Sequence, residues 1–377
     1  MIKKRWLIFV ILLILCSSLV QAFPFLQSYL NLRNILSKQE LQKRFNDYNP
    51  PNIEVMLLPK YMLDFSVALL KIRITDKKTR IISVDARIIT KNKARTLSLF
   101  DDGLHSDNNA NDAVFTGYLR TVDFNNEQNV NIEITAIDQA LNKITVRRNV
   151  QLLPRNVCER FVLNGNTNEK LDLLILGDKY SNKIEMINEF NRSYNNILLF
   201  EPFKKDKNKF NIFYIDSTEL NLDCHYGCYR NLSYSMCCDS EKVGIISTQC
   251  PNDVVGVIVN STAYGGTYNF NPSYFVAYKY GYNDNTVVHE FGHAMGLMDE
   301  YDYKLIAGSS ILPWGPNCET KSTCTSWAGT GGTGCFSSCT YSNWFRPIKA
   351  NTLMYDNRGD YGHVNQKHLN NVLANYK

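Results

Sequence analysis

The sequence has little net charge of either sign. Its 377 residues carry a formal charge of +5. Loss of the basic N-terminal segment, with Lys3, Lys4 and Arg5, would leave 38 basic and 36 acidic residues, a charge of +2. A domain that binds nucleic acid or an anionic membrane through charge needs a clear basic excess. We therefore expect no nucleic-acid partner.

Long apolar runs are also lacking beyond the N-terminus. The run from Trp6 to Leu15 is short for a membrane span. It follows three basic residues and precedes Val20-Gln21-Ala22, which is typical of a signal-peptide cleavage site. The sequence predicts a signal peptide over residues 1–22, a secreted, periplasmic or cell-surface protein, and no stable membrane span. Cys16 suggests a lipoprotein alternative, but Leu15 is too large for the usual processing site.

Cysteines, in contrast, are plentiful: ten follow the signal peptide. They are Cys158, then Cys224, Cys228, Cys237, Cys238 and Cys250, then Cys318, Cys324, Cys335 and Cys339. An even number in an exported chain favours disulfides over a zinc cluster. The connectivity cannot be read from the sequence. We expect the last four cysteines to pair among themselves, because they lie in one short loop-rich segment.

Two regions precede the cysteine-rich part of the chain. Residues 23–51 have a loosely helical pattern that ends at Asn49-Pro50-Pro51, which predicts a helical lead or pro-segment. Residues 52–155 contain short alternating stretches, such as Phe65-x-Val67-x-Leu69 and the run from Val130 to Ala136. Such stretches, separated by turns, predict an immunoglobulin-like β-sandwich.

An oxygen-rich loop, DDGLHSDNNANDAVFTG, spans residues 101–117 within this region. It resembles a motif of bacterial surface-protein sandwich domains. A Ca²⁺ site is conceivable, but the Gly and Glu of an EF-hand are not in the required places. The sequence favours a solvated turn, with His105 as an ordinary loop residue.

Residues 156–377 have a different pattern, in which strands and helices alternate. Apolar runs of strand length are LDLLIL at 171–176, FNIFYI at 210–215 and VVGVIV at 254–259. Ser181 or Asn182 is expected to cap a helix, and 274–278 to form an edge strand. The chain as a whole is therefore predicted to be α+β, with a zincin-like α/β domain that contains the active-site helix.

The most informative stretch is HEFGHAMGLMDEY, residues 289–301. Its first five residues form an HExxH motif, in which His289 and His293 lie on one helical face and can bind one Zn²⁺. Gly296 lets the chain leave the helix, so that Asp299 can fold back as a third ligand. The metal would acidify a water molecule, and Glu290 would take its proton as general base.

HExxH alone also occurs by chance on buried helices, but the context here supports the metal site. Asn283, Asp284 and Asn285 offer N-caps for the helix. The motif extends to HExxHxxGxxD, a metzincin-like layout. Downstream, NTLMYD at 351–356 includes Met354, a candidate Met-turn beneath the metal. His363 and His368 are expected to be ordinary polar residues.

These residues together resemble the IgA-peptidase-type family of secreted zinc metallopeptidases, over about 160–377. The resemblance rests on LDLLILGDKY, EPFKKDKNKFNIFYID, VNSTAYGG, HEFGHAMGLMDEY, and WFRPIKANTLMYD with GHVNQ. It implies one zinc ion per chain, His289 and His293 as ligands, and Glu290 as base. Asp299 fits the metzincin spacing of the third ligand, with Glu300 as the alternative. Tyr355, next to Met354, is a candidate for stabilising the oxyanion.

The expected function is therefore that of a secreted zinc endopeptidase acting on protein or peptide substrates. Two alternatives remain open. One is an adhesin or binding protein on the same scaffold, although the intact Glu290 argues against it. The other is a zinc amidase that cleaves a glycan-linked amide. The sequence does not reveal the substrate or the oligomeric state.

Overall fold

The computed structural model describes residues 37–107, 109–124, 127–228, 232–279, 285–302, 315–349 and 351–377. The predicted signal peptide and the lead segment before Ser37 lie outside these residues. The chain divides between Leu153 and Pro154 into two compact units, which are described separately. None of the helices in the described ranges is long and apolar enough to cross a membrane.

The N-terminal unit begins with a short helix, α2 (Lys38–Phe45). The Ser37 hydroxyl accepts the backbone N–H of Glu40, and the Glu40 carboxylate accepts the backbone N–H of Ser37. This reciprocal capping box satisfies two donors that a helix start otherwise leaves unpaired. Part of the predicted lead is thus helical.

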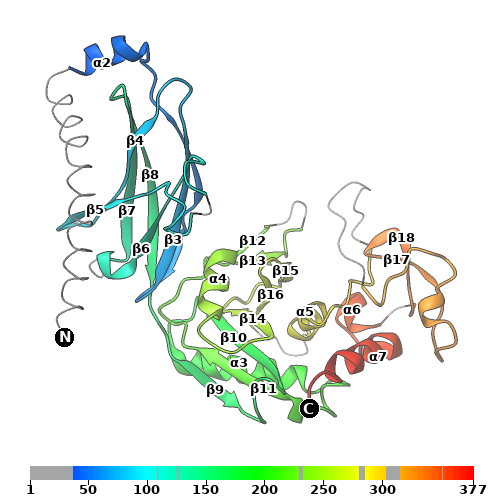
Figure 1. The fold of residues 1–377 in the computed structure, drawn as a ribbon. Coiled ribbons are helices and arrows are strands. Elements are labelled where there is room, and N and C mark those ends of the chain that lie inside the picture. Colours follow the sequence, from blue (N-terminus) through cyan, green and yellow to red (C-terminus); the bar gives the residue numbers. More distant parts are fainter. Residues whose placement is uncertain are drawn as a thin grey trace, which may run out of the picture. The chain divides into compact units, whose positions relative to one another are not determined.

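Two sheets follow α2, in the orders β1-β3-β6 and β2-β8-β7-β4-β5 (Figure 1). Their strands are β1 (Asn52–Leu57), β2 (Tyr61–Leu63), β3 (Val67–Thr75), β4 (Ile81–Ile89), β5 (Ala94–Ser98), β6 (Val114–Arg120), β7 (Asn129–Asp138) and β8 (Lys143–Leu153), with a 3₁₀ turn η1 (Thr121–Phe124) after β6. Alternate residues of β7, from Val130 to Ala136, are fully buried and share one core with β3. The two sheets therefore form the predicted β-sandwich.

The residues of β3 that face the core are not the ones that the alternation predicted. Phe65 precedes the strand with a positive φ of 56° and is 73% exposed. Val67 is exposed as well, whereas Leu70 and Ile72 are completely buried. The alternation predicted through Phe65, Val67 and Leu69 is therefore wrong by one residue. The adjacent apolar pair Leu69-Leu70 is compatible with either phase, and a shift of one residue exchanges the two faces of a strand.

The C-terminal unit is built on a six-stranded sheet in the order β15-β16-β14-β10-β11-β9. Its parallel strands are β10 (Leu171–Asp178), β11 (Phe210–Ile215), β14 (Val254–Val259) and β16 (Ser273–Tyr278); its antiparallel edge strands are β9 (Cys158–Val162) and β15 (Gly266–Phe270). The three predicted apolar runs are the buried strands β10, β11 and β14. The predicted edge strand is wrong, because β16 lies inside the sheet and β15 forms the edge.

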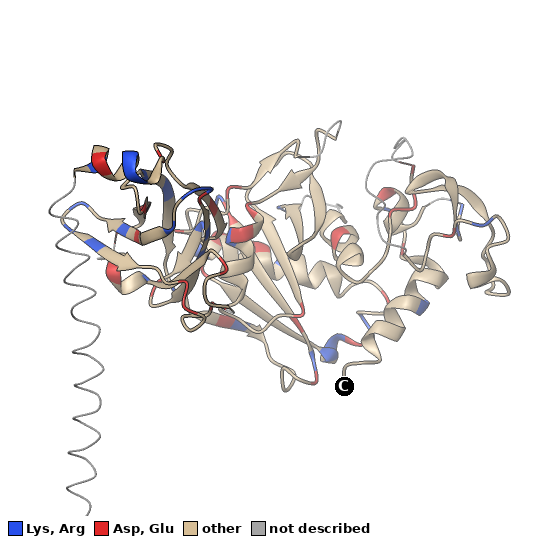
Figure 2. Cartoon of the chain, turned by 45° about the horizontal axis from the view of Figure 1, so that its top comes forward, with Lys and Arg blue, Asp and Glu red and all other residues tan. Residues whose placement is uncertain are grey.

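Helices α3 (Lys183–Ile197) and α5 (Thr286–Ala294) share a core with this sheet. The Asn182 side chain accepts the N–H groups of Ile184 and Glu185, as one of the two predicted caps. The remaining elements are α4 (Ser240–Ser247), α6 (Leu353–Asp356), α7 (Gly362–Leu373), η2 (Lys207–Lys209), η3 (Thr325–Trp327), β12 (His225–Tyr226), β13 (Met236–Cys237), β17 (Phe336–Cys339) and β18 (Tyr341–Arg346). Both units carry basic and acidic residues (Figure 2).

All ten cysteines after the predicted signal peptide form disulfides. The pairs are Cys158–Cys250, Cys224–Cys238, Cys228–Cys237, Cys318–Cys339 and Cys324–Cys335. The last two pairs confirm that the four cysteines of the 318–339 segment pair among themselves. Closing these loops compensates for the scarcity of regular structure in that segment, because each cross-link lowers the entropy of the unfolded chain.

Candidate metal centre

Helix α5 holds the two histidines of the HExxH motif on one face. Its buried Val288 and Phe291 pack into the core of the C-terminal unit and so fix the rotation of the helix. His289 and His293 are one turn apart, and their Nε2 atoms lie 3.1 Å from each other. The predicted pairing of the two imidazoles is therefore present.

The start of α5 differs from the expectation. Asn283 and Asp284, two of the predicted N-caps, lie outside the described residues. Asn285 is the N-cap, but its side chain makes no capping hydrogen bond. Its Nδ2 instead donates to the carbonyl oxygen of Asn357, at 2.9 Å. The prediction that the Asn285 side chain caps α5 is thus wrong, because this amide instead joins α5 to the segment that follows α6.

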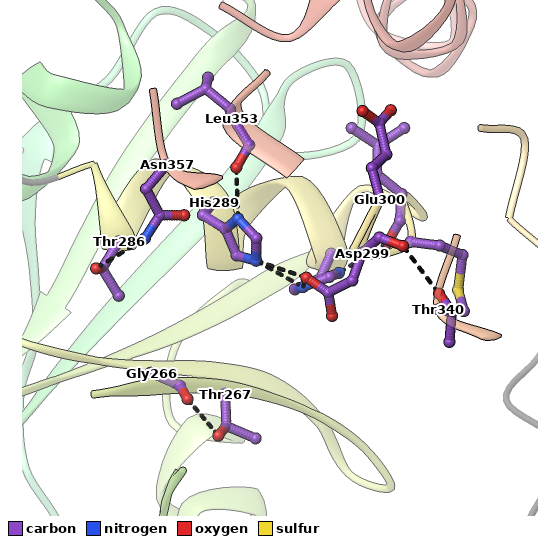
Figure 3. Close-up of polar contacts among 12 residues, drawn as sticks. Gly266, Thr267, Thr286, His289, Asp299, Glu300, Thr340, Leu353 and Asn357 are labelled. Carbon is purple, nitrogen blue, oxygen red and sulfur yellow. Dashed lines mark hydrogen bonds and ion pairs between the residues drawn. The ribbon is translucent and has the colours of Figure 1, made fainter. Parts of the chain in front are cut away.

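Asp299 returns to the two histidines after the helix ends. Gly296 has a φ of 94°, in the region that favours glycine, and reverses the chain direction. One Asp299 carboxylate oxygen, Oδ1, then lies 2.9 Å from His289 Nε2 and 3.3 Å from His293 Nε2 (Figure 3). The three side chains form a group whose ligand atoms could hold one metal ion.

Backbone carbonyl groups orient both imidazoles. The Nδ1 atom of His289 lies 2.6 Å from the carbonyl oxygen of Leu353, and that of His293 lies 2.8 Å from the carbonyl oxygen of Leu297. A carbonyl oxygen can only accept, so Nδ1 carries the proton in each ring. The lone pair is left on Nε2, where the rings meet, and this arrangement is usual for histidines that bind metals.

The spacing of the three donor atoms suits zinc. Tetrahedral zinc with bonds of about 2.0–2.1 Å separates its ligand atoms by roughly 3.4 Å. The three separations here, 2.9, 3.1 and 3.3 Å, are within a few tenths of an ångström of that value. Two imidazoles and a carboxylate are also a donor set of catalytic zinc sites, which leave one position for water. The residues present therefore fit the metal.

The electrostatics of this cluster favour a cation. Burial by itself lowers the pKa of His289 and His293, but the Asp299 carboxylate raises both above the ordinary value. Burial likewise raises the pKa of Asp299, yet the two imidazoles hold it far below the usual range. The buried carboxylate thus attracts positive charge to the point where the three side chains meet.

Glu290 lies beside the two histidines and is buried. Burial raises the pKa of its carboxyl group to about 8. Its Oε2 atom is inaccessible and has no hydrogen-bond partner among the described residues. A buried polar atom without a partner is costly and marks a place where a bound molecule supplies the missing interaction.

Gly266, at the start of edge strand β15, leaves the room that the Glu290 side chain occupies. A Cβ atom at this position would lie 2.6 Å from Glu290 Oε1 and 2.7 Å from Thr286 Cγ2. Gly266 ends the VNSTAYGG stretch, one of those that carry the family resemblance. The sequence did not reveal its contact with Glu290. Strand β15 therefore helps to position the base of the HExxH motif.

Met354, the predicted Met-turn residue, lies against helix α5. Its side chain is fully buried. A Cβ at Gly292 would approach its sulfur to 2.8 Å, so the small residue inside the motif lets the methionine pack against α5. Tyr361 supports the same side of the helix by donating its hydroxyl hydrogen to the carbonyl oxygen of Val288, at 2.6 Å.

Glu300, the alternative third ligand, points away from the imidazoles (Figure 3). Its carboxylate accepts hydrogen bonds from Asn317 and Asn365 on Oε1 and from Thr352 on Oε2. Burial raises the pKa of Glu300, and these three donors partly offset the effect. The buried carboxylate thus joins the segment after Asp299 to three other parts of the unit.

Tyr355, the predicted candidate for stabilising the oxyanion, is contacted by Arg346. The guanidinium carbon of Arg346 lies 4.6 Å from the centre of the Tyr355 ring, and its nitrogens donate to backbone carbonyls such as that of Lys349. Three other tyrosines, Tyr234, Tyr268 and Tyr301, interact with residues of the centre.

The rings of Tyr268 and Tyr301 lie 6.3 and 6.4 Å from those of His293 and His289 respectively. The pKa of Tyr234 is raised by burial and by the negative charge of Asp299. Tyr301 ends the HEFGHAMGLMDEY stretch, whereas Tyr234 and Tyr268 come from separate segments that no local pattern joins to the motif.

The other histidines named in the sequence analysis have partners or positions of a different kind. His368 Nε2 is 2.9 Å from the carbonyl oxygen of Met295, close to the end of α5. His363 is part of helix α7. His105 pairs with Asp102 in the N-terminal unit. In the described ranges, none of them belongs to a group that could hold a metal.

Comparison with known proteins gives one family. The family model for IgA Peptidase M64 matches residues 161–330, which include the HExxH motif and Asp299 but end before Met354. No curated protein matches the chain in sequence.

Among solved structures, the chain is similar to fibronectin(III)-like modules of Clostridium thermocellum CbhA, with 10% identity, a TM-score of 0.21, and coverage of 29% of this chain and 49% of that one. It is also similar to the endo-β-1,4-mannanase of Thermotoga petrophila, with 6% identity, a TM-score of 0.22, and coverage of 29% and 21%. Murine CRIg has 10% identity, a TM-score of 0.19, and coverage of 28% and 99%. The chain thus spans about half of the first structure. With TM-scores this low, the matches carry no argument about the fold, which is therefore described from the order of the strands.

Proposed function

We propose that this chain, whose residues 161–330 match the family model for IgA Peptidase M64, is a zinc endopeptidase whose active site is the His289–Asp299 segment. One observation carries the proposal. The Nε2 atoms of both histidines and Oδ1 of Asp299 converge, and the buried Glu290 beside them has an oxygen without a partner.

His289, His293 and Asp299 would hold one zinc ion per chain. Zinc at this place would supply Lewis-acid chemistry, lowering the pKa of water and polarising a carbonyl group. Glu290 is the general base, which takes a proton from the attacking water and returns it to the leaving amine nitrogen. Burial raises the pKa of Glu290, which makes its carboxylate a stronger proton acceptor.

We assign the third ligand to Asp299 rather than Glu300. Asp299 lies within 3.3 Å of both imidazoles, whereas both oxygens of Glu300 already accept hydrogen bonds from Asn317, Asn365 and Thr352. A carboxylate held by three neutral donors could not turn to a metal without leaving those donors unpaired.

The substrate would lie as an extended peptide along edge strand β15. This strand pairs with β16 on one side. On its other side, in the described part of the chain, it has an isolated bridge between Gly266 and Ser235. Exposed edges pair with extended peptides through main-chain hydrogen bonds. Tyr268 of β15 stacks towards His293, so a peptide on this strand would pass the metal ligands.

The finer features follow from the same argument. We propose a zincin-like catalytic domain over residues 156–377 with Met354 as the Met-turn, preceded by an immunoglobulin-like domain over 52–155. The lead over 23–51 and the signal peptide over 1–22 complete the domain assignment. Five disulfides favour an oxidising, extracellular setting.

The decisive experiment is the substitution Glu290→Gln in the purified mature chain. It removes the proton acceptor but none of the three ligands, so zinc content should stay near one per chain. Turnover of casein should fall by about 10²–10⁴, the usual contribution of general acid–base catalysis. The matched control is Glu185→Gln, an exposed residue on α3, which should keep full activity.

Peptidoglycan is the second substrate in this assay. Cleavage of peptidoglycan but not casein would reassign the enzyme to glycan-linked amides. Full casein activity in Glu290→Gln would overturn the mechanism. Absence of turnover on both substrates by zinc-loaded wild-type protein would favour a binding protein.

A further inference from the structure

The loop between β5 and β6 gathers three carboxylates in the N-terminal unit. Asp101, Asp107 and Asp112 each offer one oxygen, and these oxygens lie within 4.8 Å of one another. The neck of the loop is closed by the bridge between Phe100 and Thr116. Three negative charges at this spacing repel one another unless a cation lies between them.

Asp107 supplies a second and independent observation. Its side chain is only 4% exposed. Its Oδ2 accepts the backbone N–H of Gly103 at 3.1 Å, but its Oδ1 is buried and has no partner in the described ranges. A carboxylate oxygen is costly to bury without a hydrogen bond or a cation. The solvated turn favoured by the sequence does not account for this burial.

The other two aspartates have neutral partners only. Asp101 accepts the N–H groups of Asp112 and Ala113, at 3.1 and 3.0 Å. Asp112 uses Oδ1 to accept the N–H of Val114, at 3.0 Å. Within the described segments, none of the three forms an ion pair with lysine, arginine or histidine. The negative charge of the loop is therefore not balanced by a protein cation.

We infer that this loop binds a calcium ion through one carboxylate oxygen each of Asp101, Asp107 and Asp112. The ligands are all oxygen, which selects a hard cation over zinc. Three carboxylate ligands favour Ca²⁺ over Mg²⁺, because Mg²⁺ usually keeps several waters and binds through one or two carboxylates. Water and backbone carbonyls complete the 6–8 ligands that Ca²⁺ takes.

A second acidic group in the same unit provides the contrast. Asp47, Asp76 and Asp138 also approach within 4.8 Å, but none of their buried oxygens lacks a partner. The Asn142 backbone and side chain donate to both oxygens of Asp138, and the Thr79 hydroxyl donates to Asp47. This group is satisfied by the chain itself, so it serves as a negative control.

The test uses the full mature chain, freed of metal with a chelator and desalted. CaCl₂ is titrated by calorimetry, and thermal unfolding is followed with and without 10 mM Ca²⁺. We expect one site with a Kd of about 10⁻⁴–10⁻³ M, the range of extracellular calcium modules. At 10 mM Ca²⁺ the melting temperature should rise by roughly 5 °C.

Asp107→Asn is the test variant, and Asp102→Asn and Asp76→Asn are the controls. Asp102 lies in the same loop but pairs with His105. The Asp107→Asn protein should lose the calcium-dependent shift while melting no lower than the wild type without calcium, because one repulsive charge is removed. Both controls should keep the shift.

Two results would overturn the inference: no calcium-dependent shift in the wild type, or an equal shift in Asp107→Asn. A larger shift with Mg²⁺ than with Ca²⁺ would overturn the choice of ion. None of these results bears on the peptidase assay, because the loop and the zinc ligands belong to different units.

Discussion

The His289–Asp299 segment and the Asp101–Asp112 loop each bring three ligand-type side chains together within about a dozen residues, but they are supported differently. Distant segments orient the ligands of the first, such as the Leu353 carbonyl that fixes the His289 ring. The carboxylates of the second accept hydrogen bonds from backbone N–H groups of the loop itself.

The two groups also differ in their donor atoms, and each kind of donor needs a different kind of hydrogen-bonding partner. Imidazoles need a fixed tautomer and ring orientation, which His289 takes from the distant Leu353 carbonyl and His293 from the nearby Leu297 carbonyl. Carboxylates offer several lone pairs and tolerate the variable geometry of calcium. A rigid site for chemistry thus depends on the folded unit, whereas a stabilising site can be encoded in one loop.

The largest effect should come from removing an imidazole. His293→Ala takes away one zinc ligand, so zinc content should fall to near zero. Activity should fall by more than the ~10²–10⁴ expected from loss of the base. The zinc-dependent rise in melting temperature should vanish too, because metal binding stabilises the folded state. Zinc content is measured by inductively coupled plasma mass spectrometry, activity by the casein assay, and the melting temperature by thermal scans.

This variant also separates the two sites. His293→Ala should keep the calcium-dependent shift of the N-terminal unit unchanged, with Asp107→Asn as the reciprocal variant. Loss of the calcium response in His293→Ala would mean that calcium binds at the histidines and that the two sites are not distinct.

Substitutions of the two adjacent acidic residues, Asp299 and Glu300, should affect different properties of the protein. Asp299→Asn weakens a ligand and should deplete zinc. Glu300→Gln should keep zinc but lower the free energy of unfolding by about 1–3 kcal/mol, because an amide nitrogen would face one of its donors and leave it unpaired. Zinc content and urea unfolding would be measured for both variants. The reverse pattern would make Glu300 the ligand.

The choice between Asp299 and Glu300 shows how far the sequence can be interpreted. The pair of histidines depends on helical spacing, which is local, so the HExxH motif predicted it. Asp299 fits the metzincin spacing, but Glu300 follows the same glycine turn and stayed open as the alternative. We propose Asp299 over Glu300 because Asn317, Thr352 and Asn365 donate to the Glu300 carboxylate, and these contacts exist only in the folded chain.

The same limit applies to the sheets. Apolar runs predicted β10, β11 and β14, because strands buried on both faces are continuous in hydrophobicity. Which strand lies at the edge depends on strand order, and so β16 was wrongly expected there in place of β15. The buried oxygen of Asp107 was equally invisible, because burial is a property of the closed loop.

A smaller effect should follow from the contact between β15 and the base. Gly266→Ala would bring a methyl group to 2.6 Å from Glu290 Oε1, so the carboxylate must shift. We expect kcat to fall by roughly 10–100-fold, since misplacement of a catalytic group by about 1 Å costs that much, while zinc content is retained. The control Gly331→Ala meets no atom within 4 Å and should be neutral. Unchanged kcat in Gly266→Ala would show that β15 does not position Glu290.

The smallest change in kcat should come from a substitution of Tyr355. It tests whether this residue belongs to the metal centre. Tyr355→Phe keeps the ring that contacts Arg346 and removes only the hydroxyl group. If that hydroxyl does not reach the reacting carbonyl, kcat should change by less than about 2-fold, against the ~10²–10³ that loss of an oxyanion donor costs. Tyr234→Phe should be measured beside it, because the pKa of Tyr234 responds to the Asp299 charge and its hydroxyl therefore lies within the field of the centre. A fall of 10²-fold or more in Tyr355→Phe alone would restore Tyr355 as the oxyanion donor and would require Arg346 to release its ring during turnover.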